Sequence, residues 1–415
     1  MSVLHPDLLT ADGEGARPVR IVMKDAALAD VEAAWARAND FTGKAGQILL
    51  VPGADGAIAG ALFGAGDAFD PMAVRALAAR LPEGLWRLEG LEADDAARAA
   101  VAFALGAYRF DRYKARPAGG ARLAVDPGLD VAAILRIAAA CALAREMVDT
   151  PAADMGPLQI ETIAREIAEA SGASLTVATG DALLEANYPA VHAVGRAAAP
   201  HRAPRVIELG WKLDRTDLPV RLVVLVAAVE NAISGDAFRP GDILNSRKGL
   251  TIEIGNTDAE GRLILADILT RAGEHAPDLT LDFATLTGAA RIALGPDLPP
   301  LYSEDEALVA DLLEASRAVG DPLWPMPLWP GYRAALETEI ADVRNDSAAW
   351  AQAGSITAAL FLQKFAPTSG AWAHMDIFAW NPRAQPGRPE GGEAQGLRAC
   401  FEMLSRRYPR SPAPR

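Results

Sequence analysis

The sequence predicts an α/β protein, with a smaller N-terminal α/β domain and a C-terminal domain whose mixed, largely parallel sheet is flanked by helices. Apolar segments of strand length alternate with segments of helical period along most of the 415 residues. Such alternation is typical of strands joined by helices that cover both faces of a sheet. The chain also exceeds the roughly 150 residues of an average domain, which indicates more than one domain.

The N-terminal part combines a strand-like segment, Gly46–Val51, with a helical one, Asp94–Ala107. A stretch rich in proline and glycine follows at Lys114–Gly128, and such a composition favours a linker. We therefore expect an N-terminal domain over residues 1–128 and a connecting helix over 129–149. Because proline at 151 disfavours helical continuation, the catalytic domain is expected over 150–415.

Strand and helix signals continue to alternate in the second domain. We expect strands at 174–179, 206–209, 221–229, 251–254 and 279–285, and helices at 157–171 and 263–272. Ligands of open α/β sheets gather at loops beyond the carboxyl ends of strands, so these loops are where a site is expected.

The net charge of −14 argues against a nucleic-acid partner, because phosphate binding needs a basic surface. An acidic field attracts cations instead, including divalent metals and the ammonium group of a peptide. The apolar run Leu222–Val229 is far shorter than the ~20 residues that span a bilayer, so no membrane association is expected. The N-terminal segment shows no secretory pattern, and the cytoplasm is the expected compartment.

The segment Lys248–Asp267 combines the features of a cation site. A strand is expected to end near Ile254, and Asp258 and Glu260 then precede a helix that begins near Arg262. Two carboxylates at such a position can share a cation, and oxygen ligands suit magnesium, manganese or zinc. Helix capping is the alternative that the spacing leaves open, since negative charge is favoured at a helix N-terminus.

The sequence NTDAEGRL at Asn256–Leu263 resembles, residue for residue, the motif of the leucyl aminopeptidases, also called cytosol aminopeptidases. Four flanking segments are similar to that family as well: AVENAISGDAFRPGD at Ala228–Asp242, ATLTGAA at Ala284–Ala290, GSITAALFL at Gly354–Leu362 and WAHMDI at Trp372–Ile377. The chain is thereby identified as a member of the family, with a likeness that extends over about residues 103–404.

The resemblance implies a metallo-exopeptidase that releases N-terminal amino acids from peptides by two-metal activation of water. It implies these roles: Asp258 and Glu260 as metal ligands, Arg262 as a catalytic residue, and Thr285, Leu286 and Gly288 as substrate-binding residues. The implied cofactors are two manganese or zinc ions and a bicarbonate beside the arginine, and the implied assembly is a homohexamer. A tight strand-to-helix turn is the alternative for residues 285–288.

The sequence departs from the family between Trp211 and Leu218, where only six residues, KLDRTD, intervene. The family's segment with a ligand lysine, two ligand aspartates and a catalytic lysine is missing there, which amounts to a strand and a helix. Three residues near this point, Lys212, Asp214 and Asp217, do not match its spacing and indicate a polar turn.

A missing interior strand would leave sheet edges exposed. A non-catalytic homologue that keeps the fold and the oligomer contacts is therefore the alternative function.

His374 lies on an expected strand, and we expect it to have a structural, hydrogen-bonded role.

Overall fold

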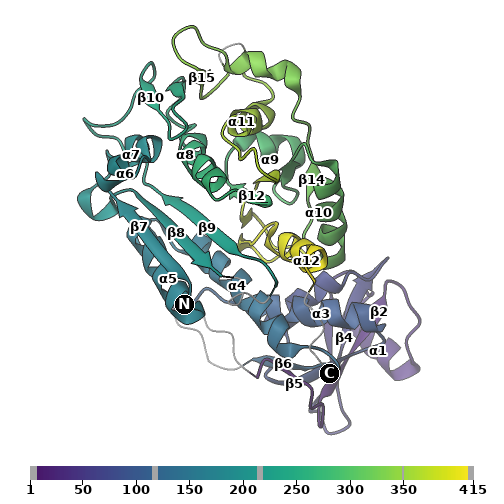
Figure 1. Ribbon diagram of the computed structural model, residues 1–415. Coiled ribbons are helices and arrows are strands. Elements are labelled where there is room, and N and C mark those ends of the chain that lie inside the picture. The colour runs from purple at the N-terminus through teal and green to yellow at the C-terminus, as the bar shows by residue number, and fades with distance from the viewer. Residues whose placement is uncertain (1–6, 115–119, 213–217, 348–349, 410–415) are drawn as a thin grey trace. The chain divides into compact units, whose positions relative to one another are not determined.

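The computed structural model describes residues 7–114, 120–212, 218–347 and 350–409, and it confirms the α/β class (Figure 1). It divides into two compact units. The first unit comprises Met1–Asp149 and Ala379–Ala394, and the second comprises Thr150–Phe378 and Gln395–Arg415. None of the helices in the described ranges is long and apolar enough to cross a membrane.

The first unit is built on a six-stranded sheet of order β1-β6-β5-β2-β4-β3. All neighbouring strands are parallel except β3 and β4, which are antiparallel. The strands are β1 (Leu9–Thr10), β2 (Arg17–Met23), β3 (Ile48–Pro52), β4 (Ile58–Gly66), β5 (Gly84–Glu89) and β6 (Ala121–Ala124). The helical segments are α1 (Asp30–Ala38), η1 (Pro71–Ala76), α2 (Leu77–Arg80), α3 (Ala93–Gly106) and α4 (Val131–Asp149).

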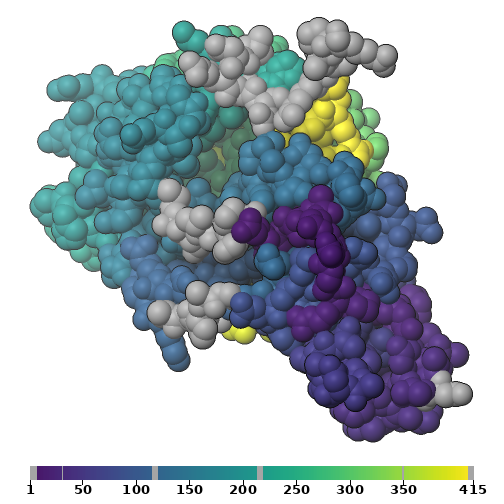
Figure 2. All heavy atoms as spheres, turned by 90° about the horizontal axis from the view of Figure 1, so that it is seen from below, coloured from purple at the N-terminus to yellow at the C-terminus, as the bar shows by residue number. Residues whose placement is uncertain are grey.

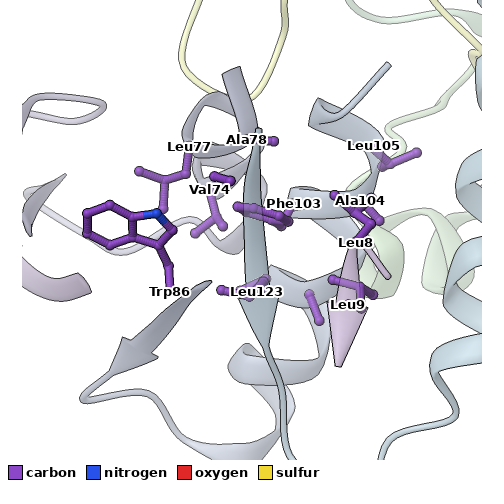
Figure 3. Close-up of a cluster of buried hydrophobic side chains, with 14 of the residues drawn as sticks. Leu8, Leu9, Val74, Leu77, Ala78, Trp86, Phe103, Ala104, Leu105 and Leu123 are labelled. Atoms are coloured by element: carbon purple, nitrogen blue, oxygen red, sulfur yellow. The ribbon is translucent and has the colours of Figure 1, made fainter. Parts of the chain in front are cut away.

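A hydrophobic core between this sheet and its helices stabilises the first unit (Figure 3). Trp86 of β5, Phe103 of α3 and Leu77 of α2 are fully buried there, together with Leu123 of β6. Burying each such side chain contributes about 1.5–3 kcal/mol relative to leaving it exposed. The outer surface of residues 7–110 is drawn in purple and blue in Figure 2.

One sequence prediction about the first unit needs correction. Part of the expected linker, Ala121–Ala124, is strand β6 and pairs with both β1 and β5. By their contacts, the helix α4 and the distant segment Ala379–Ala394 group with this unit.

Buried polar contacts explain why the distant segment belongs to the first unit. Arg145 Nε donates to the Gly392 carbonyl at 2.7 Å, and the Gly392 backbone N–H donates to Asp149 Oδ1 at 2.6 Å. Arg75 forms an ion pair with Glu393 at 2.7 Å. Within the segment, β17 (Trp380–Asn381) pairs with β18 (Gly391–Gly392).

The second unit contains three separate sheets, of order β7-β8-β9, β10-β11-β15 and β12-β16-β13-β14. Its strands are β7 (Ser174–Thr179), β8 (Arg205–Trp211), β9 (Leu222–Ala228), β10 (Ile243–Asn245), β11 (Thr251–Glu253), β12 (Leu279–Ala284), β13 (Pro300–Tyr302), β14 (Trp324–Pro325), β15 (Val343–Arg344) and β16 (Ala371–Asp376). Its helical segments are α5 (Pro157–Ser171), α6 (Ala182–Glu185), α7 (Pro189–Gly195), η2 (Pro200–Arg202), α8 (Gly261–Glu274), α9 (Gly288–Leu294), α10 (Glu306–Val319), η4 (Pro330–Leu336), α11 (Gly354–Gln363) and α12 (Leu397–Arg407).

Among the described residues, the strands β9 and β12 belong to different sheets (Figure 1). Among the described residues, β9 pairs with β8 alone and β12 with β16 alone, so each strand has one open edge. The strand β9 reads LVVLVAA, the continuous apolar pattern of an interior strand, yet Leu222 is 39% exposed. In the part of the chain that the structure describes, β9 is thus an edge strand.

Candidate active site

The loop between β11 and α8 carries the two carboxylates that the sequence singled out. The Asp258 backbone N–H donates to Asn256 Oδ1 at 2.9 Å, which closes a tight turn after β11. This turn leaves Asp258 exposed and brings half-buried Glu260 to the N-cap position of α8. Within the described ranges, neither carboxylate has a hydrogen-bond or ion-pair partner in the protein, and Glu260 makes no capping bond. The pair is thus available to a cation.

Arg262 lies in the first turn of α8 and is buried. Its Nη1 donates to the Asn345 carbonyl at 2.6 Å, while no atom of the described residues accepts a hydrogen bond from its Nε. Burial lowers the pKa of Arg262 to about 10, although the charges of Asp346, Asp376 and Glu260 oppose the shift. The guanidinium therefore stays protonated at neutral pH and provides a fixed positive charge near Glu260.

Of the predicted substrate-binding residues, exposed Thr285 and half-buried Leu286 lie in the loop between β12 and α9, and exposed Gly288 is the first residue of α9. This loop lies next to the carboxylate loop. A Cβ atom added to Gly261 would lie 3.2 Å from Leu286 Cδ1, a close approach that only glycine permits without adjustment. The structure thus places Leu286 beside Gly261, the residue that follows Glu260.

Asp376, at the end of β16, binds the loop between β12 and α9, which we call the substrate loop. Its Oδ1 accepts hydrogen bonds from the backbone nitrogens of Leu286 at 2.9 Å and Thr287 at 3.1 Å. Its Oδ2 accepts from Thr287 Oγ1 at 2.6 Å and from Ser355 Oγ at 3.0 Å. The sequence analysis did not assign this role to Asp376, because nothing in a local pattern indicates a partner about 90 residues away.

His374 has the structural role that the sequence predicted. It is fully buried, its Nδ1 lies 2.6 Å from Asp282 Oδ1, and Trp372 Nε1 donates to Asp282 Oδ2 at 2.7 Å. Burial by itself lowers the pKa of His374, but the adjacent Asp282 charge and hydrogen bond outweigh it and raise the pKa.

The described residues do not fit a complete two-metal centre. In ranges 7–114, 120–212, 218–347 and 350–409, no three side chains of His, Cys, Asp or Glu are arranged to hold a metal ion. Lys212 is exposed, and Asp214 and Asp217 lie outside the described residues. The site offers Asp258 and Glu260 alone, which leaves most coordination positions of an ion to water.

Comparison with known protein families identifies the family. The model of the cytosol aminopeptidase family, catalytic domain, matches residues 142–217 and 212–401, and the model of the M17 aminopeptidase N-terminal domain matches residues 22–126. Together these matches cover most of the chain, and the chain belongs to the cytosol aminopeptidase family, which is metal-dependent.

Solved structures of relatives have the same fold. The cytosol aminopeptidase from Coxiella burnetii is 36% identical with a TM-score of 0.88, and the match covers 97% of this chain and 99% of that one. The bottromycin maturation enzyme BotP in complex with Mn is 30% identical with a TM-score of 0.84, over 94% of this chain and 99% of that one.

Curated relatives match over different shares of their length. A probable cytosol aminopeptidase from Syntrophotalea carbinolica is 37% identical over 63% of this chain, which spans only 62% of that protein. A probable cytosol aminopeptidase from Leifsonia xyli subsp. xyli is 31% identical over 93% of this chain and 91% of that protein.

The longer alignments contain a gap in this chain. The alignment with the Leifsonia xyli protein extends over 460 positions but includes only 93% of the 415 residues here, so that about 74 positions have no counterpart. The family match consists of two segments, residues 142–217 and 212–401, which overlap at residues 212–217, shortly before β9. The junction of the two segments lies where the sequence departs from the family.

Proposed function

We propose that this chain is a leucyl aminopeptidase-like metallo-exopeptidase, which releases N-terminal amino acids from peptides. One observation carries the proposal: two carboxylates without protein partners, Asp258 and Glu260, precede a buried arginine at a strand end beside the substrate loop. Family membership supports the reaction class, and the acidic net charge of −14 favours the ammonium group of a peptide N-terminus.

In this proposal Asp258 and Glu260 hold a divalent ion, manganese or zinc. The family resemblance implies two such ions and a bicarbonate, whereas the described residues supply only these two carboxylates as ligands. Arg262 provides a buried positive charge beside the negative charge that develops on the substrate in the transition state. A fixed charge in a buried site stabilises such a transition state most strongly.

The substrate loop supplies the peptide-binding groups of the proposal. The backbone groups of Thr285 and Gly288 bind the peptide, and the Leu286 side chain contacts the bound peptide. Asp376 already binds the backbone N–H group of Leu286, so that the loop is ordered before substrate arrives.

The incomplete ligand set favours a second candidate, a non-catalytic homologue that keeps the fold and the oligomer contacts. The described residues supply two carboxylates without a third metal-binding side chain, and about 74 positions of the alignment with the Leifsonia xyli protein have no counterpart in this chain. Losing ligands and an electrophilic group removes most of the rate, because each contributes several kcal/mol. For either candidate we propose a homohexamer in the cytoplasm, on the strength of the family resemblance.

An assay of the purified, metal-loaded chain separates the two candidates. The parent chain and the variant Asp258→Ala are incubated with manganese or zinc and with leucyl-p-nitroanilide. Asp311→Ala, which removes an exposed carboxylate of α10, is the matched control. Release of p-nitroaniline by the parent and the control, but not by Asp258→Ala, supports the peptidase. Equal rates in the parent and in Asp258→Ala reject the peptidase and leave the non-catalytic homologue.

A further inference from the structure

The guanidinium group of Arg291, in α9, lies over the aromatic ring of Phe378. Its Cζ atom is 4.4 Å from the ring centroid. A cation over the face of an aromatic ring is attracted by the negative charge of that face, and the flat guanidinium also stacks on it. Arg291 is exposed, so the contact orients the group while its N–H donors stay accessible.

The ring of Phe378 is itself fixed beside the substrate loop. The Phe378 backbone N–H donates to Gln395 Oε1 at 2.9 Å, and Gln395 Nε2 donates to the Pro296 carbonyl at 2.8 Å. The preceding backbone N–H, that of Ile377, donates to the Ala284 carbonyl at 2.9 Å and so continues the pairing of β16 with β12. The ring therefore follows the strand end at which the substrate loop begins.

The guanidinium reaches back toward the substrate loop. Long side chains of a helix point toward its N-terminus, so Arg291, the fourth residue of α9, covers the first turn. A Cβ atom added to Gly288 would lie 3.5 Å from Arg291 Nη2. Gly288 is exposed, follows the substrate loop directly and is one of the proposed substrate-binding residues. A peptide that lies on Gly288 would therefore contact the guanidinium.

The positive charge of Arg291 is not neutralised within the protein. In the part of the chain that the structure describes, its side chain has neither an ion pair nor a hydrogen bond, and its contact is with the ring. Arg344, by contrast, pairs with Glu253 and Asp346. A guanidinium presents its N–H donors in a planar fork that matches the two oxygens of a carboxylate. An oriented, unpaired guanidinium is therefore suited to bind a carboxylate of a ligand.

We propose that Arg291 is a substrate-binding residue that binds a carboxylate of the peptide and makes the chain select peptides that carry one beyond their first residue. The inference deepens the proposed function and rests on it, but it requires no metal ligand from the protein. Two groups of a peptide present the same pair of oxygens, the C-terminal carboxylate of a short peptide and an acidic side chain.

The test measures the affinity of the chain for three peptides by isothermal titration calorimetry. Leucylglycine has a C-terminal carboxylate, leucylglycinamide has none, and the α-amide of leucylaspartate has a side-chain carboxylate alone. The titrations are carried out with and without Mn²⁺, and peptides are compared at equal Mn²⁺. A hydrogen bond to a charged group is stronger than one between neutral groups, so the parent should bind at least one carboxylate peptide about 10-fold more tightly than leucylglycinamide.

Three variants assign this preference to Arg291. Arg291→Gln keeps a polar side chain without the charge, so it should bind the three peptides with equal affinity. Arg291→Lys keeps the charge but loses the planar fork, so it should keep part of the preference. Arg317→Gln is the matched control, because Arg317 is an exposed arginine in the last turn of α10. It should keep the full preference of the parent.

The outcomes distinguish this inference from the proposed function. A preference that disappears in Arg291→Gln and remains in Arg317→Gln supports the inference, and the preferred peptide identifies the source of the carboxylate. Equal affinity of the parent for all three peptides overturns the role of Arg291 and leaves the proposed function standing. A preference that persists in Arg291→Gln overturns the role as well. A parent chain that binds none of the peptides contradicts both proposals.

Discussion

Asp376 binds Leu286 through a partly buried hydrogen bond of 2.9 Å between its Oδ1 and the Leu286 backbone nitrogen. The bond connects β16, where the carboxylate is 1% exposed, to the loop in which the substrate-binding residues are expected. The order of that loop therefore depends on a strand that contributes no predicted substrate-binding residue.

Replacing Asp376 by alanine tests this dependence. Asp376→Ala leaves the backbone N–H groups of Leu286 and Thr287 without their acceptor, and a buried donor without a partner costs about 1–3 kcal/mol. We expect a lower free energy of unfolding by at least that amount, measured by urea denaturation. Asp311→Ala, at an exposed position, should leave it unchanged. Equal stability of the two variants would contradict the role of Asp376.

The open edge of β9 predicts self-association. The strand carries no charged residue or proline to block pairing with another chain, and Leu222 is exposed. Val223→Lys adds a charge next to that exposed residue, so light scattering should show less association than in the parent at equal concentration. Val31→Lys, at an exposed valine of α1, is the control. If both variants associate like the parent, the edge is not the contact.

Asp267 predicts a pH dependence of stability. This fully buried carboxyl accepts hydrogen bonds from the backbone nitrogens of Ala190, Val191 and Arg247, yet burial raises its pKa to about 6. The folded chain therefore binds this proton more tightly than the unfolded chain, whose carboxyl has an ordinary value near 3.8. The stabilisation from protonated Asp267 is present below about pH 4 and is lost as the pH rises through 6, a change on the order of 3 kcal/mol.

Urea unfolding of the parent and Asp267→Asn between pH 4 and 7 measures this contribution. The parent should lose free energy of unfolding relative to the variant over that interval, because asparagine does not titrate. A constant difference between the two chains would show that Asp267 has an ordinary pKa.

Glu393 predicts that the segment 379–394 is required for the stability of the first unit. Glu393→Ala removes the ionic partner of Arg75, a buried arginine. An uncompensated buried charge costs about 3–5 kcal/mol, so the thermal midpoint of the unit should fall markedly. Asp67→Ala, which breaks an exposed ion pair with Lys24, should leave the midpoint unchanged. Similar midpoints for both variants would refute the assignment of this segment to the first unit.

Local pattern predicted the bounds of two elements of the second unit correctly. The helix over 157–171 and the strand over 174–179 have the predicted bounds, because periodicity and flanking proline and glycine mark their ends. The turn after β11 and the start of α8 also lie where NTDAEGRL indicated. In these segments the secondary structure is determined by the pattern of about fifteen neighbouring residues.

The features of the fold and the site that the sequence did not predict depend on long-range contacts. The strand Ala121–Ala124 was hidden in a stretch rich in proline and glycine, and its pairing with β1 and β5 is what orders it. The contacts of Asn345 with Gly255 and of Asp376 with Leu286 span about 90 residues, which no local spacing reveals. In the described residues β9 and β12 each lie at a sheet edge, and that these edges mark a missing strand stays a prediction.

The most direct test of the central claim is the anomalous diffraction of crystals of the chain soaked in zinc. We predict a zinc peak at about 2.0–2.2 Å from carboxylate oxygens of both Asp258 and Glu260. The peak should be absent in Asp258→Ala crystals. Zinc bound elsewhere, or two carboxylates that point away from each other at full zinc occupancy, would contradict the account.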